Sequence, residues 1–153
     1  NEYNYIIDTL DSLKYQNKEL LKNTLTILVI NNSKDDKNEI IANNKNTHTL
    51  IKNKAYNFEH VILDFYSSKN ALSPNRSGVG YARKIGMDFA LKYSHANSLF
   101  CSLDADTILN QKYLFTINSF FKDENKLVST VNFTHQKSKD KETEIGIRIY
   151  EKE

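Results

Sequence analysis

The chain has 153 residues, a length typical of one domain that can bury a hydrophobic core without disulfide bonds. Hydrophobic residues make up 39% and charged residues 26%, and the net charge of +2 is too small to recruit nucleic acid. No apolar run is long enough to span a membrane, and no basic segment typical of a signal peptide is present at the start. The single cysteine, Cys101, lies in an apolar run, which predicts a buried thiol. We expect one cytoplasmic domain over residues 1–153.

The first half of the chain predicts helices that alternate with short apolar strands. Leucine and isoleucine recur near helical spacing over residues 3–22, which predicts an amphipathic helix. Residues 24–30, TLTILVI, form a continuous apolar run that is typical of a strand buried on both faces. A polar, weakly helical stretch follows over residues 36–55, and HVILDF at residues 60–65 predicts a second strand.

The second half continues the alternation after a loop that contains the only proline. A helix is expected over residues 79–93 and another over residues 110–121. The first of these would bury Ala82, Ile85, Phe89 and Ala90. SLFCSL at residues 98–103 predicts a buried strand, and KLVSTVNF at residues 126–133 predicts another. A solvated segment follows, and the final residues, 145–153, predict the start of a further helix.

This alternation predicts an α/β fold in which helices flank a mostly parallel sheet. In such sheets the ligand binds beyond the carboxyl ends of the strands. The predicted strands end at Asn31 and Asn32, at Asp64, and at Asp104 and Asp106. Because polar residues follow these strands, we expect them to line one shared crevice.

Asp104 and Asp106 stand directly after a predicted buried strand, with one alanine between them. Two carboxylates this close repel each other, and desolvating them is costly unless a cation compensates their charge. Mg²⁺ or Mn²⁺ is commonly held by one or two carboxylates together with the phosphates of a substrate. The pair therefore predicts a site for Mn²⁺ or Mg²⁺. The alternative is a solvated loop in which Asp104 caps a turn.

A second motif, SGVGYARKIG at residues 77–86, places Gly78 and Gly80 before a helix that carries Arg83 and Lys84. Glycine lets a backbone approach a ligand closely, and the N-terminus of a helix attracts phosphate. The third glycine of the dinucleotide-binding fingerprint is absent, because Arg83 stands at its place. The alternative is a helix entry with a solvated arginine; the carboxylate pair favours a phosphate site.

Together these segments resemble the family 2 glycosyltransferases of the GT-A fold. NEYNYIIDTLDSLKYQ is similar to the Asn-Glu and first helix that follow the family's first strand, and TILVINNSKDD to its second strand and base-binding loop. GVGYARKIGMDFAL is similar to the family's Gly…Ala-Arg-Asn helix, and FCSLDADTIL to the strand that carries its D-x-D motif. The resemblance covers roughly residues 1–134 and implies a Rossmann-like GT-A fold. It also implies that the first strand is missing ahead of Asn1 and that the acceptor half lies beyond Glu153.

The resemblance implies a role for several residues. Asp104 would contact the ribose or the metal, and Asp106 would ligate the metal that bridges the donor diphosphate. Asn31 or Asn32 would meet the nucleotide base, and Arg83 would lie near the nucleotide. The family usually has Asp where Asn31 stands, and an amide changes the pattern of hydrogen-bond donors and acceptors offered to a base.

The implied partners are a nucleotide-diphosphate sugar as donor and a glycan, a lipid or another hydroxyl compound as acceptor. Gly80 and Asp64 would line the donor site beside the residues above. Lys84 replaces the asparagine that usually follows the family's arginine. No residue matches the family's catalytic base, so we expect the chain to bind the donor but not to complete transfer by itself.

Two other functions stay open. LDADT also fits the D-x-D-x-T motif of haloacid-dehalogenase-type phosphatases, in which the first aspartate is the nucleophile and both bind Mg²⁺. That motif normally opens its domain, whereas here it comes late and leaves little chain for the lysine and the acidic pair that the mechanism needs. The other alternative is a non-catalytic nucleotide-binding module.

Overall fold

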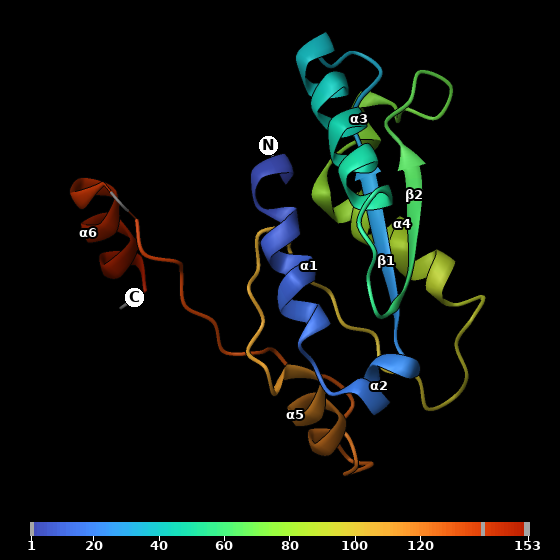
Figure 1. The fold of residues 1–153 in the computed structure, drawn as a ribbon, viewed down its shortest axis with the longest axis vertical. Coiled ribbons are helices and arrows are strands. Elements are labelled where there is room, and N and C mark those ends of the chain that lie inside the picture. Colours follow the sequence, from blue (N-terminus) through green and yellow to red (C-terminus); the bar gives the residue numbers. More distant parts are fainter. Residues whose placement is uncertain (1, 139, 152–153) are drawn as a thin grey trace. The chain divides into compact units, whose positions relative to one another are not determined.

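The computed structural model describes residues 2–138 and 140–151, and their fold is mixed α/β (Figure 1). The chain divides into two compact units. The first unit is Asn1–Ser119 and contains the sheet, and the second unit is Phe120–Glu153 and contains the last helix. This division concerns compactness alone, so a single domain over residues 1–153 stays a prediction.

The predicted helix over residues 3–22 is interrupted. A short 3-10 turn, η1 (Glu2–Asn4), leads into α1 (Ile6–Lys14), and α2 (Lys18–Lys22) follows after a break. Asn17 begins α2, because its side-chain oxygen accepts hydrogen bonds from the backbone N–H groups of Glu19 at 3.0 Å and Leu20 at 3.1 Å. Asparagine is a favoured residue at this position, which explains why a second helix starts here.

The sheet has two parallel strands, β1 (Leu25–Asn31) and β2 (Glu59–Phe65), which confirms the two strands predicted in the first half of the chain. Helix α3 (Asn38–Lys52) connects them and confirms the weakly helical stretch (Figure 1). The register runs from Leu25 opposite Glu59 to Asn31 opposite Phe65. Within β1 only Ile30 is fully buried, so burial on both faces was overestimated.

Helix α4 (Val79–Ala90) packs on β1 and confirms the helix predicted there; the short turn η2 (Pro74–Arg76) precedes it. Gly86 is the point of close approach, because a Cβ at this position would lie 3.4 Å from Cγ2 of Val29 and 4.0 Å from Cγ2 of Ile27. The face expected to be buried is only partly covered: Ala82, Ile85, Phe89 and Ala90 are half-buried.

The strand predicted over residues 98–103 is wrong. The segment is irregular, and Leu99 and Phe100 are 45% and 44% exposed. Cys101 is also exposed, so the prediction of a buried thiol is wrong as well. A strand forms only where a neighbouring strand offers its hydrogen-bonding edge. Among the described residues β1 pairs with β2 alone, and residues 98–103 make no strand ladder.

Helix α5 (Tyr113–Phe120) confirms the helix expected over residues 110–121, with a later start. In the second unit, the strand predicted over residues 126–133 is wrong, because that segment is irregular and highly exposed. Helix α6 (Lys141–Tyr150) confirms the last predicted helix but begins earlier than expected. Its start is fixed by Asp140, whose carboxylate accepts a hydrogen bond from the backbone N–H of Thr143 at 2.8 Å. Residues 152–153 lie outside the described part.

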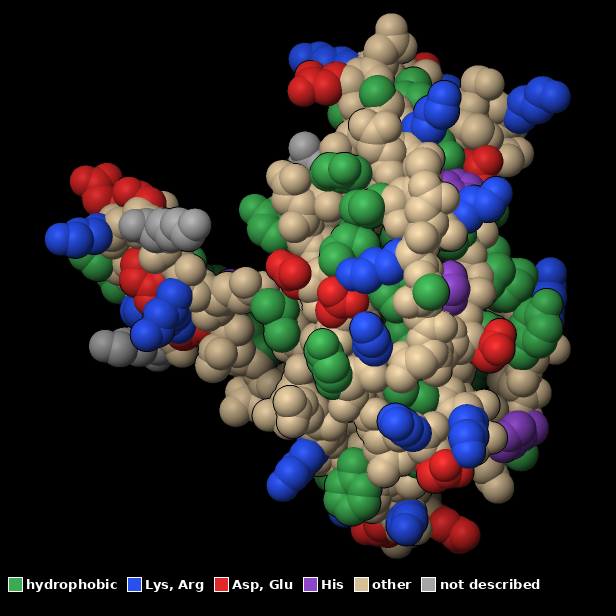
Figure 2. Space-filling model, in the orientation of Figure 1, with side chains coloured by type: hydrophobic (Ala, Val, Ile, Leu, Met, Phe, Trp, Pro, Cys, Tyr) green, Lys and Arg blue, Asp and Glu red, His purple; other side chains and the backbone are tan. Residues whose placement is uncertain are grey.

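The hydrophobic core lies within the first unit. Its buried residues come from α1, α2, β1, α3 and the connecting loops: Ile6, Leu10, Leu13, Leu21, Ile30, Ile51, Phe58 and Leu109. Half-buried side chains such as Leu28 and Ile62 pack around this cluster. On the face in view, basic and acidic side chains are interspersed over the unit (Figure 2). None of the described helices combines the length and the apolar character needed to cross a bilayer.

Candidate functional site

The parallel pairing of β1 and β2 brings the polar residues at their carboxyl ends to one edge of the sheet. Asn31 is the last residue of β1 and lies opposite Phe65, and Asp64 lies opposite Ile30. The pairing continues past the strand ends through an isolated parallel bridge between Ser33 and Leu72. This edge is where α/β proteins usually bind ligands.

Asn31 connects this edge to the glycine-containing motif. Its side-chain amide donates a hydrogen bond to the carbonyl oxygen of Ser77 at 2.6 Å. Gly78, the next residue, is the cap that precedes α4. The strand end and the start of α4 are therefore held together by a direct contact.

Asn32 has a different environment from its neighbour. Asn32 as a whole is 3% exposed. Its side-chain amide donates to the carbonyl oxygen of Ser33 at 2.8 Å, and its Oδ1 accepts from the side-chain amide of Asn44 at 2.9 Å. Asn44 also donates to the carbonyl oxygen of Asn31 at 3.1 Å. These hydrogen bonds hold α3 against the end of β1. Of the two asparagines, Asn31 is the more exposed.

Asp64 closes the turn that follows β2. Its Oδ1 accepts hydrogen bonds from the backbone N–H groups of Tyr66 at 3.1 Å and Ser67 at 2.9 Å, and its Oδ2 accepts from the side-chain amide of Asn70 at 3.3 Å. Partial burial by itself would raise the pKa of Asp64, but the hydrogen bonds from Ser67, Tyr66 and Asn70 outweigh it and lower the pKa. The carboxylate is therefore charged and already hydrogen-bonded by its own turn.

The two motifs that carry most of the sequence prediction meet in space. Nη2 of Arg83, on α4, donates to Oδ1 of Asp104 at 2.5 Å. Both side chains stay half-exposed, at 47% for Arg83 and 59% for Asp104. Gly80, one turn earlier on α4, faces open space, since apart from its chain neighbours and the backbone of its own helix no described atom lies within 4 Å of where its Cβ would be. A ligand could thus approach the first turn of α4 beside this ion pair.

Two polar side chains of α1 and a third just after its end hydrogen-bond the backbone between Ala105 and Leu114. The hydroxyl of Thr9 donates to the carbonyl oxygen of Ala105 at 2.8 Å, between the two aspartates. The hydroxyl of Ser12 accepts from the backbone N–H of Leu109 at 3.0 Å. Gln16 donates to the carbonyl oxygen of Asn110 at 2.8 Å and accepts from the N–H of Leu114 at 3.0 Å.

Sequence reasoning missed these three supporting residues. Thr9, Ser12 and Gln16 recur at helical spacing, and Thr9 and Gln16 are 7% and 3% exposed. A row of polar residues on the apolar side of an amphipathic helix is a signal that the helix hydrogen-bonds a neighbouring segment. That signal could have indicated that the helix hydrogen-bonds another segment of the chain, but it could not have identified residues 105–114 as that segment.

Asp104 and Asp106 lie on an exposed turn in which the N–H of Thr107 donates to the carbonyl oxygen of Asp104 at 3.1 Å. Among the described residues no cluster of three or more His, Cys, Asp or Glu side chains could hold a metal. Two carboxylates suit a metal that takes its other ligands from substrate phosphates and water, as Mg²⁺ does. By their chemistry alone, the two carboxylates are oxygen ligands of the kind that Mg²⁺ and Mn²⁺ take.

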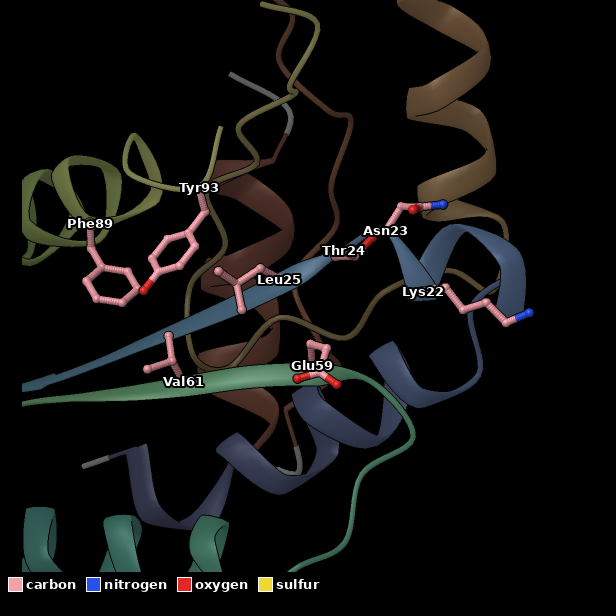
Figure 3. Close-up of a pocket in the computed structure, with 8 residues that line it drawn as sticks. All are labelled: Lys22, Asn23, Thr24, Leu25, Glu59, Val61, Phe89 and Tyr93. Carbon is pink, nitrogen blue, oxygen red and sulfur yellow. The ribbon is translucent and has the colours of Figure 1, made fainter. Parts of the chain in front are cut away.

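A cavity of about 340 Å³ lies at the opposite end of the sheet (Figure 3). Its lining includes Leu25 and Glu59, the first residues of β1 and β2, and the aromatic rings of Phe89 and Tyr93. These two ring centroids are 5.2 Å apart. Because it opens at the amino ends of the strands, this cavity is separate from the residues at the carboxyl ends.

Comparisons of the chain with models of protein families, with curated proteins and with solved structures gave no match.

Proposed function

We propose that this chain forms the donor-binding part of a glycosyltransferase similar to family 2, with a Rossmann-like GT-A arrangement. The complete enzyme would transfer a sugar from a nucleotide-diphosphate donor to a hydroxyl group of a glycan or lipid acceptor. The observation that carries the proposal is the contact between Arg83 and Asp104. It supports a single donor site because it joins the helix motif suited to phosphate and the carboxylate motif suited to a metal.

In this site Asp104 and Asp106 would hold Mn²⁺ or Mg²⁺. The bound metal would neutralise the charge that develops on the departing nucleoside diphosphate. Asn31 would hydrogen-bond the base, and its contact with Ser77 fixes its direction. The backbone beside Gly80, which faces open space, would let the diphosphate approach the start of α4.

The proposal is tested by measuring the melting temperature of the chain with UDP-, GDP- and dTDP-sugars, each with and without Mn²⁺. A donor present at about 100 times its Kd should raise the melting temperature by roughly 5–10 °C. We expect this rise for one class of donor, in the presence of Mn²⁺, and we expect Asp106→Ala to abolish it.

The matched control is Glu19→Gln, which also removes one carboxylate. Glu19 is on α2, which precedes the amino end of β1, and its partner there is Lys22. This variant should keep the full donor response. A melting temperature that no donor changes, with or without Mn²⁺, would overturn the proposal. A stable phosphate or beryllofluoride adduct on Asp104 would instead favour the phosphatase.

A further inference from the structure

The ion pair between Arg83 and Asp104 occupies a carboxylate that the proposed metal would need. Arg83 lies 2.5 Å from Oδ1 of Asp104, and both side chains are about half-exposed. A guanidinium keeps its positive charge, so a second cation that binds this carboxylate competes with it. Because exposed ion pairs are weak, replacing Arg83 by another cation at Asp104 costs little free energy.

We propose that Arg83 is an exchangeable counter-ion of Asp104. It neutralises the carboxylate until a divalent cation binds at Asp104 and Asp106, and the displaced guanidinium then binds a phosphate of the donor. This inference rests on the proposed function, because it describes the regulation of the same site. It assigns Arg83 two successive partners, first a carboxylate and then a diphosphate.

The chemistry of the guanidinium suits both partners. Its planar fork of N–H groups matches the oxygens of a carboxylate and those of a phosphate. Arg83 also lies one turn after Gly80, where the surface of α4 is open. A small change of rotamer would turn the side chain from the aspartate towards an anion at the start of the helix.

The exchange makes the binding of cation and diphosphate mutually dependent. The cation alone must compete with Arg83, so it binds less tightly than it would without this side chain. Once the cation is bound, the free guanidinium adds to diphosphate binding. By thermodynamic reciprocity the diphosphate then strengthens cation binding by the same factor.

The chain contains a matched control one residue away. Lys84 carries the same charge on the same helix, but its partner is Asp88, also on α4, rather than Asp104. Replacing Arg83 or Lys84 by glutamine changes the net charge equally. Only the change at Arg83 removes the competitor of the metal.

The test measures Mn²⁺ binding to the full chain by electron paramagnetic resonance, with and without inorganic pyrophosphate. Without pyrophosphate, Arg83→Gln should bind Mn²⁺ about two- to five-fold more tightly than Lys84→Gln, the factor expected for loss of an exposed ion pair. With saturating Mn²⁺, Arg83→Gln should bind pyrophosphate about ten-fold or more weakly than the unaltered chain. Arg83→Lys keeps the positive charge but lacks the planar fork of N–H groups. Its affinity for pyrophosphate should therefore lie between that of Arg83→Gln and that of the unaltered chain.

The outcomes separate this inference from the proposed function. Equal Mn²⁺ affinity in Arg83→Gln and Lys84→Gln, or weaker binding in Arg83→Gln, would overturn the exchange while leaving a metal site that Asp106→Ala abolishes. Absence of Mn²⁺ binding in every folded variant would overturn both proposals. Circular dichroism establishes that each variant is folded, and Arg83→Met, which is also uncharged, replaces Arg83→Gln if Arg83→Gln does not fold.

Discussion

At the scale of single residues, neighbouring polar side chains at the sheet edge differ in burial and in their hydrogen-bond partners. Asn31 reaches Ser77 across the edge, whereas Asn32 is buried and hydrogen-bonded to α3. Asp64 receives two backbone hydrogen bonds from the turn after β2. Asn32 and Asp64 thus stabilise the frame, and Asn31, Arg83 and the aspartates of the D-x-D motif present groups that a ligand could use.

The lowered pKa of Asp64 predicts a pH-dependent contribution to stability. The folded-state pKa lies below the unfolded-state value, so the unfolded chain takes up the proton first as the pH falls. The contribution of the ionised Asp64 to the free energy of unfolding is therefore complete above the ordinary pKa of aspartate. It is lost as the pH falls through the folded-state pKa. At neutral pH, Asp64→Ala should lower the free energy of unfolding by about 1 kcal/mol, the usual cost of losing a capping side chain.

Urea denaturation between neutral pH and the acid limit of folding measures this effect. Asp64→Asn is the informative control, because its amide oxygen still accepts the backbone hydrogen bonds but does not titrate in this range. The stability difference between the unaltered chain and Asp64→Asn should shrink as the pH falls below the usual range of aspartate. A difference that stays constant with pH would show that the charge of Asp64 contributes nothing.

At the scale of elements, α1 positions the D-x-D segment by hydrogen bonds to its backbone. Thr9→Val keeps the shape of the side chain but removes the hydroxyl that bonds the carbonyl oxygen of Ala105. We expect a loss of about 1 kcal/mol in the free energy of unfolding and faster amide hydrogen exchange around residues 104–110. Denaturation and hydrogen-exchange mass spectrometry measure the two effects.

Thr49→Val is the matched control for this change. The hydroxyl of Thr49 bonds the carbonyl oxygen of Lys45 within α3 and is exposed, so its removal should leave exchange in the D-x-D segment unaltered. Equal effects of the two substitutions on that segment would contradict the view that α1 holds it in place.

Periodicity predicted the helices and two strands because those signals are local. β1 and β2 have apolar runs, and each finds a parallel partner in the other. Residues 98–103 and 126–133 have similar runs but form no strand, although β1 and β2 each keep one unpaired edge among the described residues. An apolar run alone therefore does not determine that a segment joins a sheet. The break before α2 was missed although Asn17 is a residue that commonly begins helices.

The candidate site was predictable as a set of chemical groups but not as a set of contacts. Asp104 and Arg83 were each singled out by the residues around them, yet their direct ion pair joins positions 21 residues apart in the chain. The sequence alone also could not separate the roles of Asn31 and Asn32, because that distinction depends on where Asn44 and Ser77 lie after folding.

At the scale of the whole molecule, every buried hydrophobic residue that the structure describes belongs to the first unit, between Ile6 and Leu109. In the second unit, Leu127 and Val128 are 88% and 85% exposed, so they bury little apolar surface. Since stability follows mainly from buried apolar area, a chain that ends after Phe121 should unfold cooperatively with a melting temperature within a few degrees of the full chain.

Differential scanning calorimetry of the full and shortened chains measures this directly. The shortened chain keeps α5 complete, because that helix ends at Phe120. A broad, non-cooperative transition in the shortened chain would show that residues after Phe121 contribute to the core of the first unit.

Gly86 gives α4 a spacer of minimal thickness against β1. A methyl group there would just touch Val29, at 3.4 Å, so alanine fits, whereas a longer side chain would push the helix away from the strand. Arg83 is on the same helix, one turn earlier, and would move with it. Substitutions of increasing size at Gly86 would therefore increase the distance between α4 and β1 in steps. They would shift the position of the Arg83 guanidinium relative to Asp104 without altering either charged side chain.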